Sequence, residues 1–241
     1  MTSKDHSSTQ TPLINFIRTY SKFSRRDVLS AIRDGNVTVN KQCVTDATHL
    51  VSDHDTVCIN GKTIQSSTYY YYKFYKPIGT LSTFKDPQNR PDLSWHLKKN
   101  ALPESLKPCG RLDFDSSGLL LFSNDGHFIN QILHPKHAIQ KTYIISLNKP
   151  LSSNHQQQLS SGFFLADGPV SIIFDSKQSP TEFTVTISMG RNRILRRSFE
   201  HFGYTIRSLH RQSIGQISIG NLRPGEFQKI NEDFIKILVQ P

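Results

Sequence analysis

The stretch CGRLDFDSSGLLLFSNDG, residues 109–126, decides the fold of its region because it joins a polar segment to a buried strand and then to a helix. GLLLF, residues 118–122, is a short apolar run typical of a buried strand. The Asn-Asp-Gly that follows is a helix-start signal, and the next apolar residues recur at helical spacing: Phe128, Ile129, Ile132 and Leu133. The stretch therefore predicts a strand leading into a helix, preceded by two aspartates.

Asp113 and Asp115 lie two residues apart, close to Arg111. If this segment is extended, these three side chains share one face, while Leu112 and Phe114 share the other and pack on the core. Three interpretations remain open. In the first, Asp115 is a hydrogen-bond acceptor in a turn and Asp113 pairs with Arg111. In the second, the two carboxylates bind a metal, although two carboxylates are few ligands for magnesium. Alternatively, one aspartate is a nucleophile or base held by an arginine.

The composition indicates a nucleic-acid partner. Lys and Arg total 29 against 19 Asp and Glu, so the net charge is +10 and the pI about 9.6. No apolar run approaches the roughly 18 residues of a spanning helix, and the N-terminal residues do not resemble a signal peptide. Cys43, Cys58 and Cys109 form no C-x-x-C pair, as expected of reduced thiols without a zinc site. We expect a cytoplasmic protein that does not bind membranes.

Four segments follow one another along the chain. Residues 1–10 are polar and are expected to form a disordered tail. Residues 11–62 have the pattern of a compact α-β unit, and residues 63–68 are a Ser/Thr-rich linker. Residues 69–241 alternate strands and helices without a repeated parallel βαβ unit or a Gly-rich phosphate loop. The sequence therefore predicts an α+β fold, in which a small α-β module precedes a domain with a mixed, largely antiparallel sheet flanked by helices.

Individual elements can be placed within these segments. Ser24 and Asp27 form a capping-box pattern at the start of a helix in the small unit. In the larger region, residues 141–147 and 182–189 have the composition of strands. Residues 193–203, RILRRSFEHFG, predict a helix that ends at a glycine.

Several stretches, taken in order, resemble one enzyme family. Residues 109–126 are similar to the GRLD-x-D-[TS]-x-GLLL-x-[TS]-NDG signature of the RsuA-like pseudouridine synthases, which isomerise single uridines in ribosomal RNA. Other matches follow the family's order: YKPIGTLST (75–83) resembles NKPxGxxST, KTYIISL (141–147) resembles the K-x-Y strand, and residues 190–227 resemble the C-terminal stretch. Residues 11–62 resemble the S4 RNA-binding module that precedes the catalytic domain in this group.

The resemblance implies a role for particular residues. Asp113 matches the catalytic aspartate, and Arg196 matches the arginine that pairs with it. Tyr143 matches the tyrosine that packs against the target uracil and can act as a base. Asp115 matches a structural position. The resemblance also implies that neither a metal nor a cofactor is needed, and that the aspartate acts either as a nucleophile at C1′ or as a base in a glycal route.

The chain departs from the family pattern at three positions. Tyr75 replaces the usual Asn before Lys-Pro, and Ser116 replaces a frequent Thr while keeping the hydroxyl. Ile194 replaces the usual Gln two residues before the arginine, so one polar group near the substrate is missing. None of these changes removes a residue to which chemistry is assigned.

The expected partner is ribosomal RNA of either subunit, or a pre-ribosomal particle, bound by a monomer. A stacked uridine must be flipped out to react, and phosphate contacts offset that cost. The candidate contacts are Arg25, Arg26, Arg33 and Lys41 in the small unit, and Arg111, Lys141, Arg191, Arg193 and Arg197 in the catalytic domain. Two alternatives remain: a non-catalytic S4-type RNA-binding or ribosome-assembly factor, and a D-x-D metal nuclease.

Overall fold

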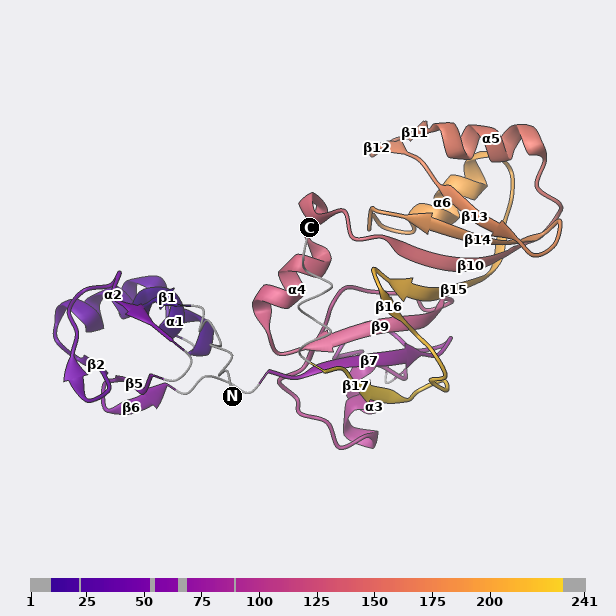
Figure 1. Ribbon diagram of the computed structural model, residues 1–241. Coiled ribbons are helices and arrows are strands. Elements are labelled where there is room, and N and C mark those ends of the chain that lie inside the picture. The colour runs from indigo at the N-terminus through magenta and orange to yellow at the C-terminus, as the bar shows by residue number, and fades with distance from the viewer. Residues whose placement is uncertain (1–9, 22, 53–54, 65–68, 89, 232–241) are drawn as a thin grey trace, which may run out of the picture. The chain divides into compact units, whose positions relative to one another are not determined.

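The computed structural model describes residues 10–21, 23–52, 55–64, 69–88 and 90–231 (Figure 1). The chain divides into two compact units, Met1–Thr68 and Tyr69–Pro241. Residues 1–9 of the expected tail and 65–68 of the expected linker lie outside the described residues. No helix in the described ranges is both long enough and apolar enough to span a membrane.

The first unit packs two helices with short strands. Its elements are β1 (Thr11–Pro12), α1 (Leu13–Tyr20), α2 (Arg25–Arg33), β2 (Val37–Val39), β3 (Gln42–Cys43), β4 (Leu50–Val51), β5 (Val57–Ile59) and β6 (Lys62–Ile64). The strands pair in the order β3-β2-β5-β6, and β1 pairs with β4. The predicted capping box is confirmed, since the Ser24 hydroxyl accepts from Asp27 N and the Asp27 carboxylate accepts from Ser24 N. Leu13, Ile17 and Val28 are fully buried between the helices and the sheet.

The boundary of the expected linker was placed too early. Thr63 and Ile64 belong to β6 rather than to a linker, because Thr63 pairs with Cys58 across the β5–β6 hairpin. Ile64 is buried in the core of the first unit. A Ser/Thr-rich composition did not reveal this last strand because only one of its residues is apolar.

The second unit is built on one large sheet. Its helical elements are α3 (Leu93–Lys99), α4 (Gly126–Leu133), a 3₁₀ turn (Pro135–His137), α5 (Ser153–Ser161) and α6 (Ile194–His201). Its strands are β7 (Tyr71–Lys76), β8 (Lys107–Pro108), β9 (Ser117–Ser123), β10 (Lys141–Leu147), β11 (Phe163–Leu165), β12 (Gly168–Val170), β13 (Ile173–Lys177), β14 (Glu182–Ile187), β15 (Ile206–Ile214), β16 (Ile217–Ser218) and β17 (Phe227–Lys229).

The sheet is mixed and mostly antiparallel, as predicted. In the described part of this unit its strand order is β13-β14-β10-β15-β9-β7-β17, and in addition β8 pairs with β9 and β16 pairs with β15. Among these paired strands only β9 and β15 run parallel. They join the half of the sheet covered by α5 and α6 to the half beside α3 and α4 (Figure 1). Residues that precede β9 therefore meet residues of β10, β15 and α6 at this junction.

The elements with strong local patterns are confirmed. β10 covers residues 141–147, β9 contains the GLLLF run, and α4 begins directly after Asp125, which caps it. α6 begins at Ile194 and ends before Gly203, which adopts φ +75°.

The expectation of an extended segment with Leu112 and Phe114 on one buried face was wrong. Phe114 and Asp115 form a turn, in which Ser116 N donates to Asp113 O at 3.1 Å. Leu112 is buried, whereas Phe114 is 46% exposed. The turn rotates Phe114 out of the alternation that an extended strand imposes.

Candidate active site

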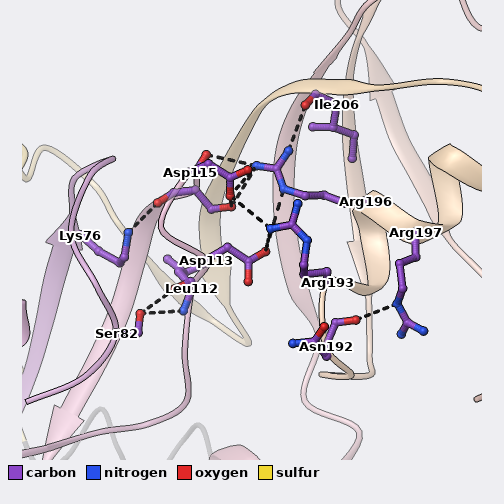
Figure 2. A network of polar contacts seen from close by, with 11 residues as sticks. Lys76, Ser82, Leu112, Asp113, Asp115, Asn192, Arg193, Arg196, Arg197 and Ile206 are labelled. Atoms are coloured by element: carbon purple, nitrogen blue, oxygen red, sulfur yellow. Dashed lines mark hydrogen bonds and ion pairs between the residues drawn. The ribbon is translucent and has the colours of Figure 1, made fainter. Parts of the chain in front are cut away.

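The turn that carries the two aspartates is fixed by the last residue of β7 and by the segment that follows this strand. Ser82 donates from Oγ to Leu112 O at 2.7 Å and accepts from Leu112 N at 3.0 Å (Figure 2). Gly79 N donates to Phe114 O at 2.9 Å. The Lys76 ammonium donates to Ser116 O at 2.8 Å. The backbone on both sides of Asp113 is therefore held in place by contacts from a remote part of the sequence.

Two arginines from the start of α6 contact both carboxylates (Figure 2). Asp113 Oδ2 lies 3.6 Å from Arg193 Nη1 and 3.9 Å from Arg196 Nε. Asp115 Oδ1 lies 3.1 Å from Arg196 Nη2 and 3.6 Å from Arg193 Nη1. The expected proximity of Arg196 to Asp113 is present, but the shorter Arg196 contact is to Asp115. Two anions thus face two cations, which is an arrangement that opposes binding of a metal cation between the carboxylates.

Arg196 is a buried and rigidly held guanidinium. It is 6% exposed, and it donates to Ile206 O at 2.9 Å, to Asp115 O at 3.1 Å and to Ser116 Oγ at 3.2 Å. Its buried Nε has no hydrogen-bond partner among the described residues, and the nearby Asp113 oxygen stays beyond hydrogen-bond distance. The Asp113 side chain remains 29% exposed. Arg196 therefore supports a carboxylate that is still open to an incoming group.

A cavity of about 790 Å³ opens beside Asp113. Its wall includes Tyr143 from β10, which is 7% exposed, and Leu209 from β15. Arg196 does not line this cavity, whereas Arg193 does. The structure therefore places Asp113 and Tyr143 on one cavity, with Arg196 behind the aspartate. Ile194, one of the departures from the family pattern, also lines the cavity and is 5% exposed.

The sequence-based RNA-binding candidates fall into three groups. Arg111, Lys141 and Arg193 line the cavity. Arg191, which also lines the cavity, and Arg197 both pair with Asp167 in the turn between β11 and β12, at 3.1 and 2.7 Å. The hydrogen bond from Arg197 is the main cause of a lowered pKa of Asp167. The remaining candidates are exposed on the first unit: Arg25, Arg26, Arg33 and Lys41.

Two buried cations near the site were missed by sequence analysis. Lys76 is fully buried, and burial lowers its pKa to about 8, although Asp113 and Asp115 act in the opposite direction. Arg211 on β15 is 3% exposed and lines the cavity. Each occupies an inward position of a strand that otherwise buries apolar residues, and a charged residue at such a position is the signal that was available. In the described ranges, no group of three or more His, Cys, Asp or Glu side chains is arranged to hold a metal ion.

Comparison with known proteins identifies the family. Residues 70–201 match the model of the RNA pseudouridylate synthase family. The chain is 32% identical over 221 residues to ribosomal large subunit pseudouridine synthase B of Bacillus subtilis strain 168, covering 89% of this chain and 90% of that protein. It is 31% identical over 215 residues to the dual-specificity RNA pseudouridine synthase RluF of Escherichia coli K12, covering 87% of this chain and 72% of that protein.

A solved structure agrees with this result. The crystal structure of a pseudouridylate synthase matches 95% of this chain and 99% of its own, with a TM-score of 0.66 and 26% identity. The family predicted from the aspartate stretch is thereby confirmed. The chain belongs to the RNA pseudouridylate synthase family.

Proposed function

We propose that this enzyme converts uridine to pseudouridine in ribosomal RNA and that Asp113 is its catalytic aspartate. The observation that carries the proposal is an open carboxylate, backed by Arg196 and Arg193, on the same cavity as the ring of Tyr143. The B. subtilis relative, named for the large ribosomal subunit, supports ribosomal RNA as the substrate.

The reaction breaks the C1′–N1 bond, turns the uracil and joins C5 to C1′. It needs an ionised carboxylate at the ribose, either as a nucleophile at C1′ or as a base for the 2′ proton. The guanidinium groups of Arg193 and Arg196 lie 3.6 and 3.9 Å from Asp113 Oδ2. Asp115 contributes indirectly, because its contact with Arg196 at 3.1 Å helps to fix the guanidinium beside Asp113. Asp113 is then the reacting group and Asp115 a positioning residue.

Tyr143 supplies a flat surface for the base. Its Cα is paired with Val185 on one side and Arg211 on the other, so the backbone is held within the sheet. A tyrosine ring stacks on a planar base, and its hydroxyl tip can accept a proton. We assign Tyr143 to hold the uracil while it turns and to accept the proton that leaves C5.

RNA binding extends beyond the cavity. A uridine must leave its stack to reach Asp113, at a cost of a few kcal/mol. Contacts to phosphates by Arg111 and Arg193 at the cavity offset that cost, as do contacts by exposed cations of the first unit, which we propose to be an S4-like RNA-binding module joined by a short linker. We further propose that the enzyme acts in the cytoplasm as a monomer.

Release of tritium from RNA labelled at C5 of uridine tests the role of Asp113. With EDTA present, wild-type enzyme should release tritium from ribosomal RNA, because the proposed chemistry uses only side chains of the protein. Asp113→Asn keeps the size of the side chain but removes its charge, and it should lower the rate by about 10⁴-fold or more, as expected when a nucleophile is removed. Asp175→Asn changes an exposed aspartate of β13 that does not line the cavity, and it should leave the rate unchanged.

Two results would contradict the proposal. Equal rates for Asp113→Asn and Asp175→Asn would remove Asp113 from the chemistry. A lack of tritium release by wild-type enzyme from small- and large-subunit RNA would instead favour the non-catalytic RNA-binding factor. Shortening of the RNA only after addition of divalent metal would favour the nuclease.

A further inference from the structure

Two cations other than those beside Asp113 lie on the cavity wall around Tyr143. Lys141 and Tyr143 are two residues apart on β10, and Arg211 is the β15 residue paired with Tyr143. Directly paired residues of antiparallel strands project to the same face of the sheet. All three residues line the cavity. Lys141 and Arg211 therefore flank the ring on which we place the uracil.

Arg211 is buried, and no anion among the described residues matches its charge. Its Nε donates to Leu119 O at 2.7 Å, whereas its buried Nη2 has no hydrogen-bond partner among the described residues. No carboxylate in the described part of the chain lies within 4.0 Å of this guanidinium. Leaving a buried charge unpaired is costly for folding. A group that enters the cavity can supply the missing acceptor.

Lys141 adds a second uncompensated charge. Its ammonium donates to Ile139 O at 2.9 Å, and within the described ranges it makes no ion pair with a carboxylate. Burial, and secondly the charge of Arg211, lower the pKa of Lys141 to about 8. Both cations line the same cavity, so an anion bound there would offset both charges.

The electron balance of the reaction supplies such an anion. When C1′–N1 breaks, the bonding pair stays with the base and is delocalised over N1, O2 and O4, so uracil carries one negative charge. C1′ then accepts an electron pair from Asp113 and forms a C1′–O bond. In the alternative route, Asp113 takes the 2′ proton and C1′ forms a double bond with C2′. Later C5 bonds to C1′ as the Asp113 oxygen leaves with its electron pair, or as Asp113 returns the 2′ proton. The C5 proton then leaves through the Tyr143 hydroxyl, which passes on its own proton, and N1 takes up a proton. The negative charge on the base thus exists only between the two bond changes.

We propose that Arg211 and Lys141 hold the carbonyl oxygens of the flipped uracil and stabilise its negative charge after the glycosidic bond breaks. The inference rests on the proposed function, since it concerns the same cavity. Phosphates remain on the RNA backbone, where the more exposed Arg111 and Arg193 are available to them. Fixed donors aimed at developing charge are worth about 10²- to 10³-fold in rate.

A change of leaving group tests this role. Single-turnover loss of the target nucleoside is measured by mass spectrometry after nuclease digestion, using RNA with uridine or 5-fluorouridine at that position. Fluorine withdraws electrons and makes the detached base a weaker base, so less help from the protein is needed. Lys141→Met should slow the reaction of uridine about 10²-fold while changing the Kd for RNA by less than about threefold. On 5-fluorouridine the decrease in rate should be at least about tenfold smaller.

Arg211 requires two variants because its Nε also bonds the backbone of β9. Arg211→Met should show the same dependence on the base as Lys141→Met, and Arg211→Lys should recover part of the rate because it keeps the charge. If Arg211→Met does not fold, the rates of Lys141→Met and Arg211→Lys on the two substrates test the inference. Lys177→Met removes an exposed lysine of β13 outside the cavity and should match wild type on both substrates.

Two outcomes would overturn the inference. Equal decreases in rate on uridine and 5-fluorouridine would show that the cations only support the structure. A weaker Kd with an unchanged single-turnover rate would show that they bind phosphate instead. The wild-type rate on uridine reports on the proposed function separately, because the inference depends only on the ratio of variant to wild type.

Discussion

At the scale of single residues, Lys76 shows how a buried charge shapes the site. It is fully buried, and its ammonium donates to Ser116 O at 2.8 Å and Pro77 O at 3.0 Å. Burial is the main cause of its lowered pKa, about 8, and the two aspartates only partly offset it. The lysine therefore holds the aspartate turn in place, and the free-energy cost of burying its charge depends on pH.

We expect stability to rise with pH because of Lys76. An unfolded lysine has a pKa of about 10.4, so between about pH 8 and pH 10.4 the unfolded chain binds more protons at this position than the folded chain. The free energy of unfolding of wild type should therefore increase relative to Lys76→Met in this window, by up to about 1.4 kcal/mol per pH unit. Below about pH 8 the difference should be constant. Urea unfolding followed by fluorescence of Trp95, the single tryptophan, measures it. A difference that does not vary from pH 7.5 to 9.5, values that bracket a pKa of about 8, would show that Lys76 has no such pKa.

The sequence motifs identified only some of the residues that form the site. Asp113, Tyr143 and Arg196 were picked out by the motifs around them, and the structure brings Asp113 and Tyr143 to one cavity with Arg196 behind. Arg211 and Lys76 were not assigned a role, because a charged residue at an inward strand position was the only sequence signal and the neighbours that bury it depend on which strands pair. Their place in the sheet, rather than their immediate neighbours in sequence, makes them part of the site.

At the scale of elements, the parallel contact between β9 and β15 requires a glycine. Gly118 has φ +113°, and a Cβ at this position would lie 2.3 Å from Arg211 O. The close approach brings the strand that carries Arg211 against the start of β9, directly after the aspartate turn. The glycine of the Ser-Ser-Gly stretch that follows Asp115 is therefore required by the close approach of β15.

Gly118→Ala should be strongly destabilising. Both the backbone conformation and the contact with β15 oppose a side chain, and we expect a decrease of about 3 kcal/mol or more in the free energy of unfolding. Gly126→Ala is the matched control, because Gly126 opens α4 and lacks a positive φ. Apart from its chain neighbours and the backbone of its own helix, no atom lies within 4 Å of the place that a Cβ would take. It should be neutral or stabilising by up to about 1 kcal/mol. Urea unfolding by Trp95 fluorescence compares the two, and equal stability would contradict the assigned contact.

Elements were predictable where their pattern is local. β10 and α4 follow from alternation and capping within their own residues. The aspartate turn was not predictable, because Ser82 and Gly79 fix it through hydrogen bonds from a segment some thirty residues away. The turn exposes Phe114, which alternation had placed in the core. The conformation of the site is thus set by tertiary contacts, whereas its candidate catalytic residues could be recognised from local sequence motifs.

At the scale of the whole molecule, charge is spread over both units. The net charge is +10, and α2 of the first unit carries Arg25 and Arg26 on its exposed first turn. Neither forms an ion pair with a carboxylate in the described part of the chain. Arg191 and Arg197, by contrast, are already paired with Asp167. The first unit therefore offers cations that can bind phosphate without first breaking an internal ion pair.

The salt dependence of RNA binding measures this contribution. Removal of one phosphate contact lowers the slope of log K against log salt by about 0.7 for single strands and 0.9 for a duplex. In the full chain, Arg25→Gln combined with Arg26→Gln should weaken binding to ribosomal RNA and reduce the slope by about 1.4 to 1.8. Arg25→Lys combined with Arg26→Lys keeps both charges and should keep the slope, because counterion release depends on charge rather than on guanidinium geometry. The single-turnover rate at saturating enzyme should be unchanged in both variants, since neither alters the cavity. An unaltered slope in the Gln variant would show that α2 does not contact RNA, and the first unit would then need another role.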